Sequence, residues 1–332
     1  GSMSISRSAW RTAGALVGAA GVTAAAAYGA QRTIMGDLRR RPDPDAGSLG
    51  PLEVDEIKQF PAHDGGVLTA FIRGEGPTVV LSHGVTIDSR VWTKQFVSLP
   101  KAGLRVVAFD HRGHGQSMVG ETGYSLNNLG CDLRTVLEEL DIQDAVLVGH
   151  SMGGVGVQEF AIHQTDALKK RVRGLVLLST FSQAPAIAPV FSSRFPGSMS
   201  LSHLMRRPNL GTVIARAGFG REPKASHVEL TRLMVAECDE RTAREASLPL
   251  AHVNFISDLA ELNIPTLVIN GTADLLTPLS GAQRTADAID GANLEILNGA
   301  GHMIMLERSQ TFDELVQEFV RSVGLTPRVS AG

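Results

Sequence analysis

Eight short runs of apolar, largely β-branched residues recur along the chain and constrain its fold more than any other feature. The later runs are continuously apolar, as strands buried on both faces are, and helical patterns separate them. Such runs build a parallel sheet that crossover helices cover on both sides. The runs are 52–60, 67–74, 78–83, 105–110, 145–149, 174–179, 266–270 and 294–298. The sequence therefore predicts an α/β fold with an eight-stranded, mostly parallel sheet.

Turn and cap residues refine this prediction. The first two runs flank His63-Asp64-Gly65-Gly66, a turn signal that predicts an antiparallel hairpin. Two helices have start signals: Thr277 as N-cap before Pro278 at the first helical position, and Ser309 before a run with apolar helical spacing. Helices are expected at 89–100, 126–140, 152–164, 278–290 and 309–323.

A long segment without a clean strand separates the sixth run from the seventh. Its length of about 85 residues is too great for a loop, and helical patterns occur near 199–206, 210–217 and 226–245. We expect a helical cap over 183–250 that covers the carboxyl ends of the strands, where open α/β sheets bind their ligands. The sheet domain then comprises residues 52–182 and 251–325, and 326–332 form a tail.

The N-terminal segment, residues 1–35, holds an uncharged Ala- and Gly-rich stretch from 13 to 30 that arginines flank. Three interpretations stay open: a membrane anchor over about residues 9–32, a secretory signal with small residues such as Ala25 and Ala27 at its cleavage site, and a docking helix. The corresponding locations are the membrane, the outside of the cell and the cytoplasm. Residues 36–51 are rich in proline and predict a stiff spacer.

Composition excludes several function classes. The net charge of −3 gives no basic footprint for nucleic acid, and the sequence contains no zinc-type spacing or Gly-rich phosphate loop. The two cysteines, Cys131 and Cys238, form neither a disulfide framework nor a CxxC motif. We therefore expect neither a metal nor another cofactor, and no nucleic-acid partner.

Ser151 stands in Gly149-His150-Ser151-Met152-Gly153, a GxSxG motif between a predicted strand and a predicted helix. A sharp turn there places a serine hydroxyl above the sheet, and it requires small residues two positions before and after the serine. The helix amino end can stabilise negative charge near that hydroxyl. The alternative is a packing turn that merely tolerates a serine.

A serine nucleophile needs a base, and the base needs an orienting acid. Asp274 follows the seventh run and His302 follows the eighth, so both belong at the sheet edge where Ser151 lies. Acyl transfer also needs donors for an oxyanion. We expect the backbone N–H of Met152 and of Val85, which follows His83-Gly84 after the third run, to supply them.

The chain from about residue 52 to 325 resembles the α/β-hydrolase superfamily. The motifs that carry the resemblance are His83-Gly84, "FDHRGHGQS" from Phe109 to Ser117, "GHSMGG" from Gly149, "GTAD" ending at Asp274, and "GHM" around His302. The resemblance implies Ser151 as nucleophile, Asp274 as acid, His302 as base and Val85 as an oxyanion donor. It also implies that the "HRGHG" segment is a structural turn.

Serine at the nucleophile position favours acyl chemistry over attack on an alkyl carbon. We therefore expect a carboxylesterase or lipase acting on a small-molecule or lipid ester, a monoacylglycerol type included, with an apolar acyl chain. Four apolar side chains are candidates for the substrate pocket: Met118, Phe181, Phe191 and Met303. Alternatives with the same triad are a cofactor-free perhydrolase, a thioesterase, a C–C bond hydrolase and an aminopeptidase. A non-catalytic ligand-binding protein and a membrane-tethered assembly factor are the alternatives outside enzymes.

Overall fold

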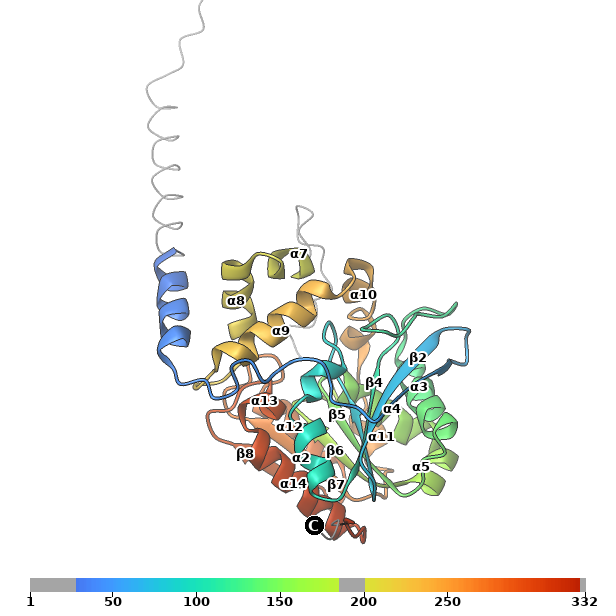
Figure 1. Ribbon diagram of the computed structural model, residues 1–332. Helices are drawn as coiled ribbons and strands as arrows, with labels where there is room; N and C mark the ends of the chain where they lie inside the picture. Colours follow the sequence, from blue (N-terminus) through green and yellow to red (C-terminus); the bar gives the residue numbers. More distant parts are fainter. Residues whose placement is uncertain (1–27, 185–200, 329–332) are drawn as a thin grey trace, which may run out of the picture.

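An eight-stranded sheet forms the centre of the molecule (Figure 1). The computed structural model describes residues 28–184 and 201–328. The strand order is β1-β2-β4-β3-β5-β6-β7-β8; β2 runs antiparallel to both of its neighbours, and the other pairs are parallel. The predicted mostly parallel sheet and its N-terminal hairpin are thus confirmed. The strands are β1 Glu56–Pro61, β2 Val67–Arg73, β3 Thr78–Ser82, β4 Arg105–Asp110, β5 Ala145–His150, β6 Val172–Leu178, β7 Thr266–Gly271 and β8 Asn293–Leu297.

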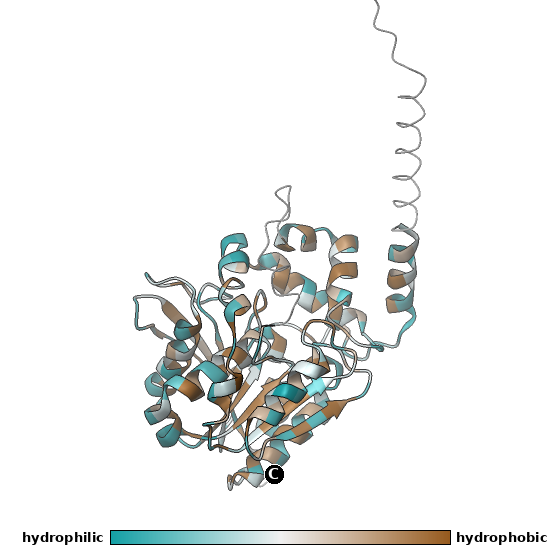
Figure 2. Cartoon of the chain, turned by 180° about the vertical axis from the view of Figure 1, so that it is seen from behind, coloured by the Kyte–Doolittle hydropathy of each residue, from teal (hydrophilic) through white to brown (hydrophobic). Residues whose placement is uncertain are grey.

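Helices cover both faces of the sheet because successive strand residues point to opposite sides. In β3, Val80 belongs to one apolar core cluster, and Val79 and Leu81 belong to the other. The strands are correspondingly among the most hydrophobic parts of the ribbon in Figure 2. The helices that contribute to the Val80 side include α3 Leu126–Glu139, α4 Met152–His163, α5 Thr165–Arg171, α11 Ile256–Leu259 and α12 Leu279–Ala288. Those on the other side include η1 Ser89–Trp92, α2 Gln95–Lys101, α13 Ile304–Glu307 and α14 Ser309–Ser322.

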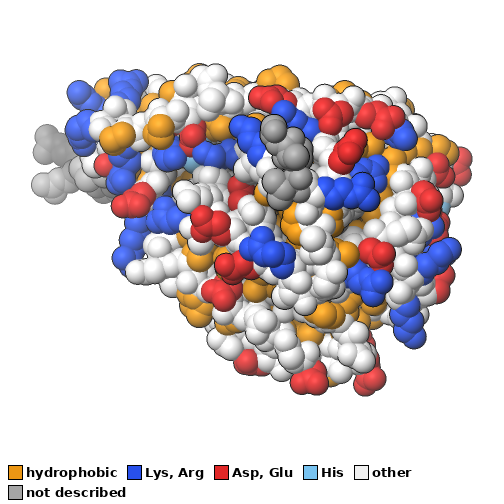
Figure 3. Space-filling model, turned by 60° about the horizontal axis from the view of Figure 1, so that its bottom comes forward, with side chains coloured by type: hydrophobic (Ala, Val, Ile, Leu, Met, Phe, Trp, Pro, Cys, Tyr) orange, Lys and Arg blue, Asp and Glu red, His pale blue; other side chains and the backbone are white. Residues whose placement is uncertain are grey.

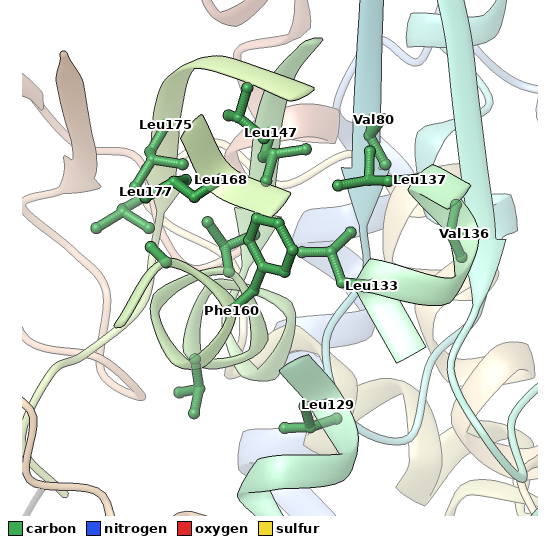
Figure 4. Packing of buried hydrophobic residues seen from close by; sticks show 14 of the residues in the cluster. Val80, Leu129, Leu133, Val136, Leu137, Leu147, Phe160, Leu168, Leu175 and Leu177 are labelled. Carbon is green, nitrogen blue, oxygen red and sulfur yellow. The ribbon is translucent and has the colours of Figure 1, made fainter. Parts of the chain in front are cut away.

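Helix α4, which follows Ser151, is fixed in position by the core beneath it. Figure 4 shows the Phe160 ring of α4 between the sheet and α3, with Leu133 and Leu147 nearby. All three side chains are at most 1% exposed. Truncating a buried phenylalanine of this kind to alanine costs about 3–5 kcal/mol of stability. The core therefore holds α4, which begins directly after Ser151, against the sheet.

Helix starts differ from the predictions at two places. Helix α12 begins at Leu279 with Pro278 as its N-cap, because the Thr277 hydroxyl is bonded to Asp274 instead. Ser309 is the first residue of α14 and Arg308 is its N-cap. The helix expected at 89–100 is divided into η1 and α2.

The described residues between β6 and β7 form helices rather than further strands of the sheet. They are α7 Leu201–Met205, α8 Pro208–Arg216, α9 Ala225–Glu237, α10 Glu240–Glu245 and η2 Pro249–His252, followed by α11. The single helix expected over 226–245 is interrupted because Asp239 accepts the N–H groups of Arg241 and Thr242 and so starts α10. Helices α7 to α10 lie together above the sheet in Figure 1. We call residues 201–252 the helical insertion.

The segment that precedes the sheet is bound to the rest of the protein rather than forming a spacer. Residues 28–40 are helical, so the boundary predicted between 35 and 36 lies inside a helix. Further on, Asp43 accepts both the N–H and the hydroxyl of Ser226 on α9, at 2.7 and 2.8 Å. Asp45 Oδ2 contacts Lys94 Nζ, Lys224 Nζ and His227 Nε2 at 2.7, 2.9 and 2.7 Å. The two aspartates thus join this segment to the helical insertion, and Asp45 also joins it to Lys94, the residue just before α2.

The predicted anchor over residues 9–32 lies mostly outside the described residues. Among residues 28–184 and 201–328, no helix combines the length and the apolarity needed to cross a bilayer. Acidic and basic side chains alternate over the face of the molecule seen in Figure 3.

Candidate active site

Ser151 occupies the sharp turn between β5 and α4. Its backbone dihedrals, φ 54° and ψ −119°, lie outside the regions that a residue with a side chain adopts without strain. The Ser151 N–H donates to the carbonyl of Leu178 at 3.1 Å, and the Thr180 hydroxyl donates to the Ser151 carbonyl at 2.7 Å. Bonds from β6 and the residues that follow it therefore hold the turn in its strained form.

Glycines around the turn allow neighbouring backbone to pass close to it. A Cβ on Gly149 would lie 2.5 Å from the carbonyl oxygen of Gly153, and one on Gly153 would lie 2.5 Å from the carbonyl carbon of Ser82. A Cβ on Gly154 would meet the Thr180 hydroxyl at the same distance. Because backbone atoms cannot yield at such distances, the first two positions accept only glycine without rearrangement of the turn.

Asp274 and His302 form a buried pair beyond the ends of β7 and β8. His302 Nδ1 lies 2.9 Å from Asp274 Oδ2, and the side chains of both are less than a tenth exposed. The other carboxylate oxygen accepts the N–H groups of Leu276 and Thr277, each at 2.9 Å, and the Thr277 hydroxyl donates to Oδ2 at 2.7 Å. Every acceptor site of the carboxylate that faces the protein is thereby occupied.

This environment sets the charge of the pair. Burial by itself would raise the pKa of Asp274, but the adjacent His302 and the donors on Thr277 lower it below its ordinary value. The carboxylate is therefore ionised at neutral pH and holds a proton on His302 Nδ1. When Nδ1 donates to the carboxylate in this way, Nε2 is the ring nitrogen left to accept a proton.

The topology brings Ser151, Asp274 and His302 to one edge of the sheet. Each residue follows the carboxyl end of a parallel strand: β5, β7 and β8 respectively. Within the described part of the chain, no hydrogen bond joins Ser151 Oγ to His302 Nε2. Such bonds are often long before substrate binds.

The loop from β3 to η1, residues 83–88, approaches Ser151 from the neighbouring strand. A Cβ on Gly84 would lie 3.2 Å from Ser151 Cβ, so the loop backbone runs directly beside the serine. Among the described residues, no acceptor takes the N–H of Val85 or that of Met152. Both predicted donors are therefore unpaired close to the Ser151 turn.

The "HRGHG" segment has a structural role at this loop, as the resemblance implied. The Thr86 N–H donates to His114 Nε2 at 3.1 Å, and His114 Nδ1 lies 3.0 Å from the Arg112 carbonyl. Thr86 itself has a positive φ of 65°. Burial lowers the pKa of His114 to about 4, so its ring is neutral at pH 7 and Nε2 can accept. His114 thus fixes the residue that follows Val85.

A second buried imidazole, that of His150, contacts the His302 loop. His150 Nε2 lies 3.0 Å from the His302 carbonyl oxygen, and the two rings are 4.7 Å apart. Burial lowers the pKa of His150 well below its ordinary value. The neutral ring therefore donates from Nε2 and fixes the backbone of His302.

The predicted substrate-pocket residues occupy different places. Met118 is 64% exposed and pairs with Val67 of β2, three strands from β5, so it does not reach the Ser151 turn. Phe181 is buried in the same core cluster as Met152, and Met303 is buried in the opposite cluster. Phe191 lies outside the described residues. Met152 borders a pocket with room for about one water molecule, whose walls combine polar side chains, among them His111, Arg112 and His114, with Leu129, Ala246 and Pro249.

Sequence reasoning missed three residues that hold the site: Thr277 on Asp274, His150 behind His302, and Glu307, which binds the His302 loop. Glu307 offered little signal, since it stands at the end of an apolar run and is followed directly by Arg308, as a surface residue could be. Thr277 offered no such signal, because a threonine before Pro278 suits a helix N-cap as well as it suits a partner of Asp274. Among the described residues, no three His, Cys, Asp or Glu side chains are grouped as metal ligands would be.

Comparison with known proteins identifies the family of this chain. The model of the alpha/beta hydrolase family matches residues 79–317. A non-heme chloroperoxidase from Kitasatospora aureofaciens is 29% identical over 252 residues, which cover 70% of this chain and 87% of the relative. A 3-oxoadipate enol-lactonase from Acinetobacter baylyi is 27% identical over 267 residues, covering 78% and 95%.

Solved structures agree with these matches. The esterase RhEst1 from Rhodococcus sp. ECU1013 superposes with a TM-score of 0.68 at 25% identity, covering 81% of this chain and 99% of the esterase. The family match spans most of the sheet, the Ser151 turn and the Asp274–His302 pair. The chain therefore belongs to the α/β-hydrolase family of enzymes.

Proposed function

We propose that this protein is a serine hydrolase that cleaves carboxylic esters through an acyl-enzyme on Ser151. The observation that carries the proposal is the buried Asp274–His302 pair, 2.9 Å apart, at the same sheet edge as a serine held at φ 54°. A serine nucleophile and an imidazole that a carboxylate orients, at one edge of the sheet, are the groups that acyl transfer requires.

In the first half of the reaction, His302 Nε2 takes the proton of Ser151 as Oγ attacks the ester carbonyl carbon. The ionised Asp274 stabilises the imidazolium that forms. The N–H groups of Val85 and Met152 hold the oxyanion of the tetrahedral intermediate, and such donors are worth about 3–4 kcal/mol each. His302 then protonates the leaving alcohol, which leaves the acyl group on Ser151.

In the second half, a water molecule attacks the acyl-enzyme. His302 takes a proton from the water, the same donors hold the second oxyanion, and Ser151 leaves with the proton from the imidazolium. The esterase and lactonase relatives act on the same bond class by name, since a lactone is an internal ester.

The full chain and its Ser151→Ala variant should be compared on p-nitrophenyl esters from acetate to palmitate. We expect the parent to hydrolyse one part of the series and the variant to lose at least about a thousandfold in kcat. Ser89→Ala is the matched control, because Ser89 is buried and its hydroxyl has no partner among the described residues. A parent that turns over none of the esters would refute the proposal.

Perhydrolysis is the second candidate, and the name of the chloroperoxidase relative favours it. In that reaction hydrogen peroxide replaces water at the acyl-enzyme, so that a peracid leaves instead of a carboxylic acid. Bromination of monochlorodimedone in acetate, peroxide and bromide measures the peracid. Activity that Ser151→Ala removes supports this function, and a parent that is inactive here but hydrolyses esters excludes it.

A further inference from the structure

The His302 loop is bound by the helical insertion as well as by the sheet. Residues 217–224 connect α8 to α9, and we call them the α8–α9 connection. The His302 N–H donates to the carbonyl of Gly218 at 2.9 Å, and the Arg221 N–H donates to the carbonyl of Gly299 at 2.8 Å. The backbone of the proposed base is therefore held directly by a segment that precedes it by about eighty residues in the chain.

Glu307, the last residue of α13, joins these two segments a third time. Its Oε1 accepts the N–H of Gly301 at 3.0 Å, and its Oε2 accepts the N–H of Gly220 at 2.7 Å. The side chain is buried, with Glu307 8% exposed overall. One carboxylate thus binds the residue before His302 and the middle of the α8–α9 connection at the same time.

The close approach of the two backbones depends on glycine. A Cβ on Gly220 would lie 2.6 Å from Gly301 N, and a Cβ on Gly301 would lie 2.5 Å from the carbonyl carbon of Phe219. With side chains at these positions, the two N–H groups could not converge on one carboxylate. The shared carboxylate of Glu307 can therefore bind both segments only because Gly220 and Gly301 lack side chains.

Electrostatics make this arrangement sensitive to the carboxylate. Burial raises the pKa of Glu307, and the N–H groups of Gly220 and Gly301 oppose that rise. A neutral or amide side chain keeps the shape but presents only one strong acceptor oxygen to two donors. One buried N–H is then left without a partner, which costs about 1–3 kcal/mol.

We infer that Glu307 is a positioning residue that couples the helical insertion to the imidazole of His302. It acts by holding Gly301 and Gly220 against each other, so that the base keeps its place beyond the end of β8 relative to Ser151. This inference rests on the proposed function, because positioning matters to the reaction only if His302 is its base.

The test compares Glu307→Gln with Asp313→Asn in the full chain. Asp313 is a matched control: it is a buried carboxylate on the adjacent α14, and it accepts from Gln95 and Ser98. Gln95 also donates to the Met305 carbonyl of α13, but among the described residues neither partner bonds to residues 299–303. We expect both variants to lose thermal stability. Only Glu307→Gln should lose about 10- to 100-fold in kcat, with KM within about twofold of the parent, because a base displaced by about 1 Å costs that much.

Hydrogen exchange measured by mass spectrometry provides a readout that does not depend on activity. In Glu307→Gln, peptides covering residues 217–222 and 299–303 should exchange faster together, and in Asp313→Asn neither should change. A parent-like kcat in Glu307→Gln, or faster exchange in one of the two peptides alone, would overturn the inference. If the parent hydrolyses no ester, the proposed function fails, and the exchange data still decide whether Glu307 couples the two segments.

Discussion

The backbone N–H of Thr86 lies 3.1 Å from Nε2 of the buried His114. This bond is one direct restraint on the loop that carries Val85, and it holds Thr86 at a positive φ. A histidine whose motif suggests a turn therefore also determines where a proposed oxyanion donor lies.

His114→Met should lower kcat for ester hydrolysis by about tenfold, because methionine cannot accept the Thr86 N–H and the Val85 donor loses its fixed direction. His114→Gln restores an acceptor oxygen and should recover part of this loss. Steady-state kinetics on one ester with both variants make the comparison. Equal kcat values for the two variants would show that the bond does not position the donor.

Ser151→Gly should stabilise the protein while abolishing hydrolysis. Glycine adopts a φ of 54° without the strain that a side chain introduces, and relief of such strain is worth about 1 kcal/mol or more. Ser151→Ala is the matched control, since it removes the hydroxyl but keeps the Cβ and the strain. Urea unfolding at pH 7 measures both, and a Gly variant no more stable than the Ala variant would contradict the expectation.

Stability should fall as the pH drops below the ordinary histidine pKa. Burial lowers the pKa of His83 and of His114 to about 4, so the unfolded chain binds more protons than the folded protein between about pH 6.5 and 4. Each ring then contributes about 2 kcal/mol of destabilisation between pH 7 and pH 5. Burial also lowers the pKa of His111 and His150 well below the ordinary histidine value, so these rings add to the effect.

The measurement is urea unfolding of the parent and of His114→Gln at pH 7, 6 and 5. The variant lacks one of these titrating rings, so its loss of stability over this range should be smaller by that ring's share. The difference between the two proteins cancels the carboxylates that titrate in both. Parallel pH profiles would mean that His114 is not held neutral by folding.

Asp45→Asn should loosen the segment before the sheet. Burial would raise the pKa of Asp45, but the bonds from Lys94, Lys224 and His227 bring it well below its ordinary value, so the charge matters to all three partners. We expect a loss of about 2 kcal/mol in unfolding free energy and faster proteolysis within residues 41–55. Asp37→Asn is the control, because its pair with Arg41 is more exposed and exposed ion pairs contribute little to stability.

Much of the fold could be predicted because its signals are local. Central strands such as β3 and β5 are recognisable as apolar runs in the sequence. The Ser151 turn is recognisable by the glycines two residues before and after the serine. Asp274 and His302 could be predicted as partners of Ser151 because the carboxyl ends of parallel strands lie at one edge of the sheet.

What could not be predicted depends on contacts between distant residues. Whether the Thr277 hydroxyl caps a helix or binds a carboxylate is decided by competition between two nearby partners, which no spacing reveals. The docking of Asp45 requires Lys224 and His227, about 180 residues away. Met118 suited a substrate pocket by type, yet its pairing with Val67 takes it to the hairpin.

The docking of Asp43 and Asp45 also sets where the chain can be shortened. A protein trimmed to begin at the first strand would keep all eight strands, but Lys94, Lys224 and His227 would face one another with no anion between them, and α9 would lose the carboxylate at its amino end. Trimming that stops before residue 37 leaves both aspartates in place. The smallest self-sufficient unit of this hydrolase therefore begins well ahead of its sheet.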